Sequence, residues 1–228
     1  MRKVLTAVLV TILLVVPASQ YAIGNEIQRE HVIILVDLSD SALHVSNELF
    51  ARKAAQYIGN TIDKLPLGSI VELRTFGEYD RSKNITSFKF LLSRKAGHRP
   101  ADVKQKIGLF IGNLPKLVSD GKLTLQEKTS LIGELKILSE RLDTTRKTRI
   151  IILSDMLEYS AEANCYKLIG SKNGKLSETP GILENVDIVA LGAGYGCKSS
   201  NENDRLKAMW SAWFEKAGAS EFRYLSDF

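Results

Sequence analysis

A set of short, almost continuously apolar runs constrains the fold of this chain more than any other feature. Residues 32–36, 149–153 and 186–191 are rich in β-branched residues and leucine. Runs of this kind are typical of strands that are covered on both faces, as in a parallel sheet between layers of helices. The chain has 228 residues, of which 44% are hydrophobic, and this suits one domain with a substantial core.

Segments with helical spacing of apolar residues separate these runs. One begins at Ser41 and ends before Pro66, and others are expected over residues 102–117, 130–142 and 206–217. Further strands are expected over residues 69–76, 85–92 and 222–225. Residues 85–92 alternate polar and apolar side chains, which favours an edge strand. The pattern predicts an α/β fold with a doubly wound, mostly parallel sheet flanked by helices and one antiparallel edge strand.

The first 24 residues stand apart from this pattern. A basic start, Met1 to Lys3, precedes an uncharged and mainly apolar stretch of roughly 13 residues and then Pro17-Ala18-Ser19. This is the layout of a secretory signal, and a membrane span needs roughly 20 apolar residues. We expect residues 1–24 to be a signal peptide, cleaved after Ala18, Ala22 or Gly24, although an uncleaved signal anchor is an alternative. Residues 25–228 would then form one exported domain, periplasmic or extracellular, with no stable membrane span.

The charge and the remaining motifs exclude several classes of function. Removing Arg2 and Lys3 with the signal lowers the net charge from +5 by two, to +3, and no aromatic residues interleave the lysines, so nucleic-acid binding is not expected. The histidines lack the spacing of a zinc hydrolase. The glycines of residues 192–196 lack the GxGxxG spacing of a phosphate-binding loop, so this segment is expected to be a turn.

The first apolar run ends in an acid and two hydroxyls at alternate positions, Asp37, Ser39 and Ser41. Ligands of parallel sheets bind at the carboxyl ends of the strands, and hard oxygen donors suit Mg²⁺. The triplet alone is equally compatible with capping of the following helix. The run at 149–153 also ends in a hydroxyl and an acid, Ser154-Asp155, and Thr129-Ser130 precede a leucine-striped helix. These two features favour a metal site.

This arrangement resembles the von Willebrand factor type A domain and its metal-ion-dependent adhesion site, over about residues 30–226. The resemblance implies that Ser39 and Ser41 bind the ion directly, that Asp37 binds it directly or through water, and that Thr129 and Asp155 come from the second and third loops. Thr124 and Ser130 are alternatives to Thr129, because the separation from Ser41 is long for the family. Family members often have glycine where Met156 stands. The expected ion is Mg²⁺, or Mn²⁺ or Ca²⁺.

The resemblance implies binding rather than catalysis. The ion would complete its coordination with an acidic side chain of another protein, or of another copy of this chain. We therefore expect an exported protein-binding module, not an enzyme, in a cell-envelope or surface apparatus. A metal-assisted hydrolase or phosphatase on the same loops is an alternative, but it would need a general base that the sequence does not show. A degenerate domain that binds its partner without metal is another alternative.

Export makes the two cysteines, Cys165 and Cys197, candidates for a disulfide. Each follows one of the apolar runs, in a loop at the carboxyl end of the expected strand. Because these two strands are expected to be neighbours, their loops emerge at the same edge of the sheet. We therefore expect a disulfide between Cys165 and Cys197.

Overall fold

The structure is a computed structural model that describes residues 28–77, 86–143, 145–171 and 173–228. The expected signal peptide, residues 1–24, lies outside this part of the chain. Within it, no helix is both long and apolar enough to cross a membrane.

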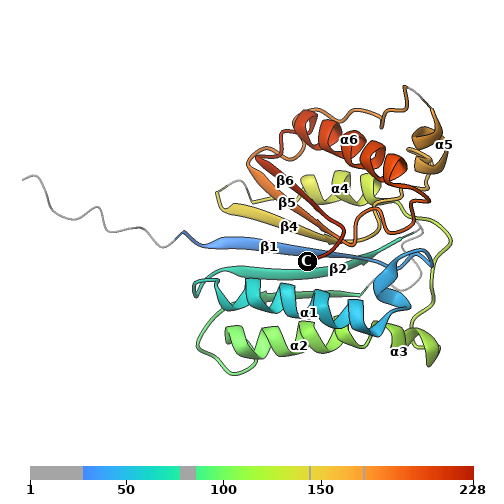
Figure 1. Cartoon of the computed structure of the whole chain (residues 1–228). Helices are drawn as coiled ribbons and strands as arrows, with labels where there is room; N and C mark the ends of the chain where they lie inside the picture. Colours follow the sequence, from blue (N-terminus) through green and yellow to red (C-terminus); the bar gives the residue numbers. More distant parts are fainter. Residues whose placement is uncertain (1–27, 78–85, 144, 172) are drawn as a thin grey trace, which may run out of the picture.

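A single six-stranded sheet forms the centre of the molecule (Figure 1). Its strands, in chain order, are β1 (Glu30–Asp37), β2 (Ile70–Phe76), β3 (Ser87–Leu91), β4 (Lys147–Leu153), β5 (Val186–Leu191) and β6 (Glu221–Leu225). Their order in the sheet is β3-β2-β1-β4-β5-β6. Only the edge strand β3 is antiparallel to its neighbour, and the other pairs are parallel. The predicted fold class, including the antiparallel edge strand, is confirmed.

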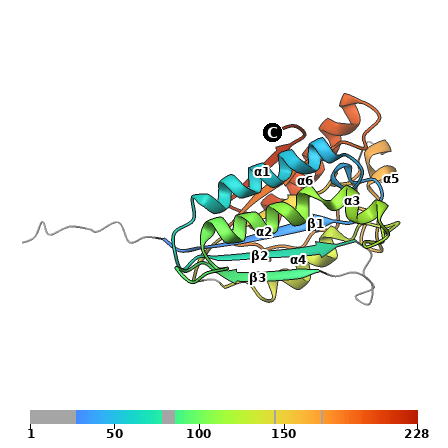
Figure 2. The same cartoon turned by 90° about the horizontal axis from the view of Figure 1, so that it is seen from below.

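Helices cover both faces of the sheet. Those on one face are α1 (Glu48–Asp63), α2 (Pro100–Gly112) and α3 (Leu114–Ser119), and Figure 2 shows α1 and α2 side by side across it. The other face carries α4 (Leu131–Ser139), α5 (Cys165–Gly170) and α6 (Ser200–Lys216). A short 3-10 helix, η1 (Leu43–Val45), precedes α1.

Alternate residues of β1 belong to two separate hydrophobic clusters. Val32, Ile34 and Val36 pack with α1 and α2, whereas Ile33 and Leu35 pack with α4 and α6. All five are fully buried. Burial of such a side chain contributes about 1.5–3 kcal/mol, so a strand that is apolar at every position is stabilised from both faces. This is why the apolar runs occupy the middle of the sheet.

All four expected helices have different bounds in the structure. The helix expected over residues 130–142 ends at Ser139, and the helix expected over residues 206–217 begins earlier, at Ser200. The helix expected from Ser41 begins only at Glu48, because the Asn47 side chain accepts a hydrogen bond from the Phe50 amide (3.0 Å) and caps it there. The helix expected over residues 102–117 is divided into α2 and α3 at Asn113. Pro115 lies in the first turn of α3, a position that proline tolerates because its missing N–H is not needed there.

The strand order changes direction between β1 and β4. The chain continues from β1 to β2 on one side, whereas β4, β5 and β6 extend the sheet on the other side. At such a switch point the loops that follow the two central strands diverge, and they leave room for a ligand at the carboxyl edge. Asp37 ends β1 at this point, and Ser154 and Asp155 follow β4.

Candidate metal-binding site

The structure brings the ends of β1 and β4 together. Because Val36 pairs with Leu153 in the parallel register, Asp37 and Ser154 are the next residues on adjacent strands. The Ser154 hydroxyl donates a hydrogen bond to Asp37 Oδ2 over 2.6 Å, and the Ser39 amide donates to Oδ1 over 2.9 Å. Both carboxylate oxygens of Asp37 are thus held, and the side chain is fully buried.

The hydroxyls of the first loop gather beside this carboxylate. The Oγ atoms of Ser39 and Ser41 lie 3.3 Å apart. Asp155, which is almost completely buried, accepts a hydrogen bond from the Leu157 amide at Oδ1 (2.9 Å). Its Oδ2 is buried and has no hydrogen-bond partner among the described residues. A buried carboxylate oxygen without a partner is costly, so this atom is the candidate ligand of a cation at the site.

Because Asp37 and Asp155 are buried close together, the negative charge of each makes ionisation of the other less favourable. Burial, and then the neighbouring charge of Asp155, raise the pKa of Asp37 to about 7. Burial also raises the pKa of Asp155. The Leu157 amide and the nearby Ser41 hydroxyl offset this in part, whereas the charge of Asp40 adds to it. In the part of the chain that the structure describes, neither carboxylate forms an ion pair with a lysine or arginine. A divalent cation between them would supply the missing positive charge.

The second loop lies between the first and the third. The backbone of Gln126 hydrogen-bonds to Leu38 and to Asp40, which joins this loop to the end of β1. At its other end, the Tyr159 amide donates to the Thr129 carbonyl over 3.0 Å. Thr129 is thus joined to the third loop, and both Thr129 and its alternative Ser130 are buried, whereas Thr124 lies at the surface.

Two further residues hold these loops, and the sequence analysis missed both. Glu158 is fully buried, and its Oε2 accepts hydrogen bonds from the amides of Leu131 (2.8 Å) and Ile132 (3.3 Å) at the start of α4. Burial raises the pKa of Glu158 to about 7. The only signal in the sequence was an acid in an apolar segment, three residues after Asp155.

His44 is the second missed residue. Its Nε2 donates to the Asp37 carbonyl over 2.6 Å, which requires that this nitrogen carry the proton. Burial lowers the pKa of His44 to about 4, so the ring is neutral near pH 7. The spacing of the histidines in the sequence indicated no role for His44, whereas in the structure it anchors the first loop to the end of β1.

Met156, which follows Asp155 after the end of β4, adopts a left-handed backbone conformation with φ of 66°. Glycine adopts this conformation without steric cost, whereas other residues do so rarely. The Met156 carbonyl accepts a hydrogen bond from Trp210 Nε1 over 2.7 Å, and its side chain is fully buried in the core. Packing and this hydrogen bond therefore hold the third loop in a conformation that the sequence alone disfavours.

The predicted disulfide is not formed in the structure, in which Cys165 and Cys197 are both free thiols. Cys165 was expected in an open loop, but it is the first residue of α5, where it is buried with its Sγ 3.9 Å from the Met156 carbonyl oxygen. Cys197 lies in the loop after β5 and is partly exposed. The short helix thus directs Cys165 into the core and not toward a loop tip.

No protein-family description matches the sequence, and no curated protein matches it. Several solved structures match the fold. Proximal thread matrix protein 1 from the mussel byssus is 15% identical, over 87% of this chain and 42% of that one, with a TM-score of 0.46. The pilus adhesin SpaC from Lactobacillus rhamnosus GG is 14% identical, over 89% of this chain and 28% of the adhesin chain, with a TM-score of 0.46. A von Willebrand factor type A protein from Catenulispora acidiphila is 13% identical, over 72% of this chain and 33% of that protein's chain, with a TM-score of 0.37.

This chain spans less than half the length of each of these structures. The assignment of the fold rests on the strand order and registers described above. At this level of similarity they say nothing about the ligand or the partner.

Proposed function

We propose that this domain, whose fold resembles that of von Willebrand factor type A domains, is a protein-binding module that captures its partner through a divalent cation. The ion, Mg²⁺ or Mn²⁺, would be held by five residues: Asp37, Ser39, Ser41, Thr129 and Asp155. The single observation that carries this proposal is the buried, unpartnered Oδ2 of Asp155, next to a second buried carboxylate with a raised pKa.

The donor set fits a hard cation. Two carboxylates and neutral hydroxyls are oxygen donors, which suit Mg²⁺ and Mn²⁺ better than softer metals. The carboxylates come from two different strands, so an ion at this place would also join the ends of β1 and β4. Bound there, the ion would act as an electrostatic acceptor for an additional oxygen ligand, because Mg²⁺ usually retains several exchangeable waters.

The surface around this edge is suited to contact with protein. Tyr159, Tyr166 and Tyr195 belong to the loops and the short helix that follow β4 and β5, and they are 42%, 53% and 59% exposed. The rings of Tyr159 and Tyr166 contact each other edge to face, with centroids 6.5 Å apart. Exposed tyrosines are enriched at protein interfaces, since they bury a large area with little loss of conformational entropy. An acidic side chain of the partner would reach the ion between them.

Binding is favoured over turnover by the state of the two buried titratable groups beside these loops. His44 uses its proton to hold the Asp37 carbonyl, and Glu158 is occupied by the amides of α4. Neither is placed to accept a proton from a water or substrate at the site. Export, and membership of a cell-envelope or surface apparatus, remain part of the proposal on the strength of the signal-like residues 1–24.

Calorimetric titration of residues 25–228 with Mg²⁺, Mn²⁺ and Ca²⁺ tests the metal site. Asp37→Asn should abolish binding, since it removes a carboxylate that no other donor replaces. Asp63→Asn is the matched control, because Asp63 is an exposed acid at the far end of α1, paired with Lys104, and should leave binding intact. Equal binding by wild type and Asp37→Asn would overturn the assignment of the site.

The partner is tested separately. Capture from an extract of the source cells should be lost in chelator and in Asp155→Ala, and restored in the wild type by Mg²⁺. A partner that binds equally well in chelator would favour a metal-independent binding domain.

A further inference from the structure

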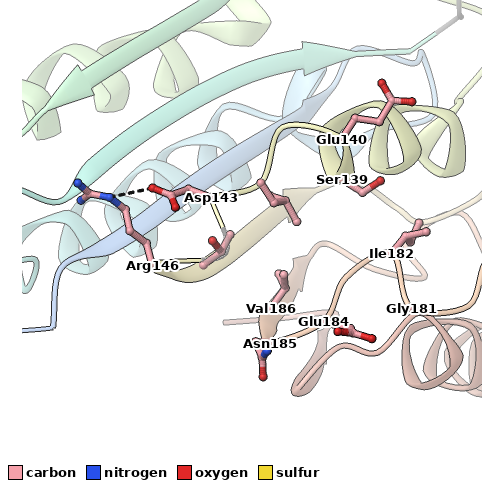
Figure 3. A pocket seen from close by; sticks show the side chains of 11 residues that line it. Ser139, Glu140, Asp143, Arg146, Gly181, Ile182, Glu184, Asn185 and Val186 are labelled. Atoms are coloured by element: carbon pink, nitrogen blue, oxygen red, sulfur yellow. Dashed lines mark hydrogen bonds and ion pairs between the residues drawn. The ribbon is translucent and has the colours of Figure 1, made fainter.

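A cavity of about 370 Å³ lies at the edge of the sheet opposite the candidate metal site. It opens at the amino ends of β4 and β5, between the connection from α4 to β4 and the segment that leads into β5 (Figure 3). Its volume falls in the range of small-molecule sites, roughly 300–1,000 Å³. Leu142, Ile182 and Val186 supply its apolar lining.

Both walls of the cavity are held by hydrogen bonds. On one side the amides of Gly181 and Leu183 donate to the Lys216 and Ala217 carbonyls at the end of α6, over 3.1 and 2.7 Å. On the other side Arg146 donates to the Gly68 carbonyl over 2.9 Å. It also donates to Asp143 over 3.2 Å, and Figure 3 shows these two side chains facing each other. The cavity is therefore preformed, and a ligand would not have to order its walls.

Thr148 provides a polar group inside the cavity. The residue lines the cavity and is only 2% exposed. Its hydroxyl forms no hydrogen bond with any residue that the structure describes. The Thr148 hydroxyl is not among the buried side-chain oxygens that lack a partner, so it is open to the cavity, and a ligand that fills the space can hydrogen-bond to it.

The charges around the cavity determine whether it favours a positively or a negatively charged ligand. Arg146 is matched by Asp143, with which it forms an ion pair. Glu140 and Glu184 also line the cavity, one from each wall, and neither has an ion pair within the described part of the chain. The carboxyl end of α4, at Ser139, adds the partial negative charge of a helix terminus. The balance is negative, and it favours a cation.

We propose that this cavity binds a primary ammonium group carried on an aliphatic chain. An ammonium has three donors and no acceptor, which suits the Glu184 carboxylate and the Thr148 hydroxyl, while Glu140, whose side chain points away from the opposite wall in Figure 3, adds negative charge at the rim. The methylenes of such a ligand would pack against Leu142, Ile182 and Val186. A lysine side chain of another polypeptide and a free alkylamine share this chemistry. The site is independent of the proposed metal site, which lies at the other edge of the sheet.

Titration of the folded domain with n-pentylammonium, followed by the amide signals of ¹⁵N-labelled protein, tests the proposal. We expect shifts centred on Thr148 and Glu184, equal in the presence and absence of chelator. Pentan-1-ol, which has the same chain without the charge, should bind at least roughly fivefold more weakly. Equal shifts with pentan-1-ol would overturn the preference for ammonium.

Matched variants test the residues. The double variant Glu140→Gln, Glu184→Gln should weaken pentylammonium binding roughly tenfold, since two exposed negative charges at the cavity are lost. Thr148→Val, which keeps the shape and removes the hydroxyl, should weaken it roughly two- to tenfold. Glu215→Gln, an exposed acid of α6 outside the cavity, should change nothing. Unchanged binding by both cavity variants, with their spectra otherwise native, would overturn the site.

The source of the ammonium is distinguished by a second probe, Nα-acetyl-lysine methylamide. Binding as tight as that of pentylammonium would indicate a lysine of a polypeptide. Binding of pentylammonium alone would indicate a free alkylamine.

Discussion

The Ser154 hydroxyl donates a hydrogen bond to Asp37 Oδ2 across 2.6 Å, although the two residues are 117 positions apart in the chain. The same hydroxyl accepts a hydrogen bond from the Met156 amide over 3.0 Å. One side chain thus joins the end of β1, the end of β4 and the loop that carries Asp155.

Ser154→Ala should weaken metal binding and destabilise the domain together. Without its hydroxyl donor, the buried Asp37 carboxylate would lose part of the stabilisation of its charged form, so its pKa would rise further above 7. We expect roughly tenfold weaker Mg²⁺ binding at pH 7, partly recovered at pH 8, and a loss of about 1–3 kcal/mol in the free energy of unfolding. Calorimetry at pH 7 and 8 checks this. Ser46→Ala, an exposed hydroxyl before α1, is the control, and a variant affinity independent of pH would contradict the reasoning.

The stability of the metal-free protein should depend on pH through Asp37. Its pKa is about 7 in the folded state, above the ordinary 3.8, so between these values the folded chain binds more protons than the unfolded chain. The free energy of unfolding therefore decreases as pH rises through this window, by roughly 2–4 kcal/mol for this group. Glu158 acts in the same direction, and His44, whose pKa is lowered to about 4, acts in the opposite direction up to about pH 6.5.

The contribution of Asp37 is isolated by comparison with Asp37→Asn in chelator. The variant should gain stability relative to wild type as pH rises from 4 to 7, measured by chemical denaturation. Above pH 7, added Mg²⁺ should make the wild type more stable than the variant, since the ion binds only the ionised wild-type site. A constant difference across the pH range would contradict the raised pKa.

Glu158→Ala should destabilise the domain by about 2–3 kcal/mol, because it leaves the amides of Leu131 and Ile132 without their acceptor. Glu158→Gln should cost less, since its amide oxygen can still accept from the start of α4. Urea unfolding checks the expected order of stability, with wild type above Glu158→Gln and Glu158→Gln above Glu158→Ala. Glu162→Ala, an exposed acid that pairs with Lys136, is the control and should have little effect.

Met156→Gly should destabilise the domain although glycine suits the local backbone. The left-handed conformation costs a non-glycine residue about 1–2 kcal/mol, whereas emptying the space of a buried methionine costs about 2–5 kcal/mol. The loss of packing is the larger effect, so we expect a net loss of about 1–3 kcal/mol in denaturant unfolding. Metal binding should be retained, because the conformation of the loop is preserved. A more stable variant would show that the strain outweighs the packing.

The sequence by itself was sufficient to predict the strands and the ligand-binding edge, because these depend on the pattern of apolar and polar residues within short segments. Continuous apolar runs identified β1, β4 and β5, because a strand that is buried on both faces needs apolar residues at every position. Alternation identified the edge strand β3, and the acid and hydroxyls after β1 and β4 indicated where a ligand would bind. Helix ends were less accurate, because the cap at Asn47 and the break at Asn113 depend on single side chains within longer apolar patterns.

Only the tertiary structure decided which distant residues meet. The adjacency of β1 and β4 places Ser154 against Asp37 and leaves Asp155 Oδ2 without a partner. It also makes Glu158 the acceptor for α4. The short helix α5 turns Cys165 into the core, against the expectation of a disulfide. Such contacts depend on how helices pack across a sheet, and the periodicity of one segment carries no information about the segment it will face.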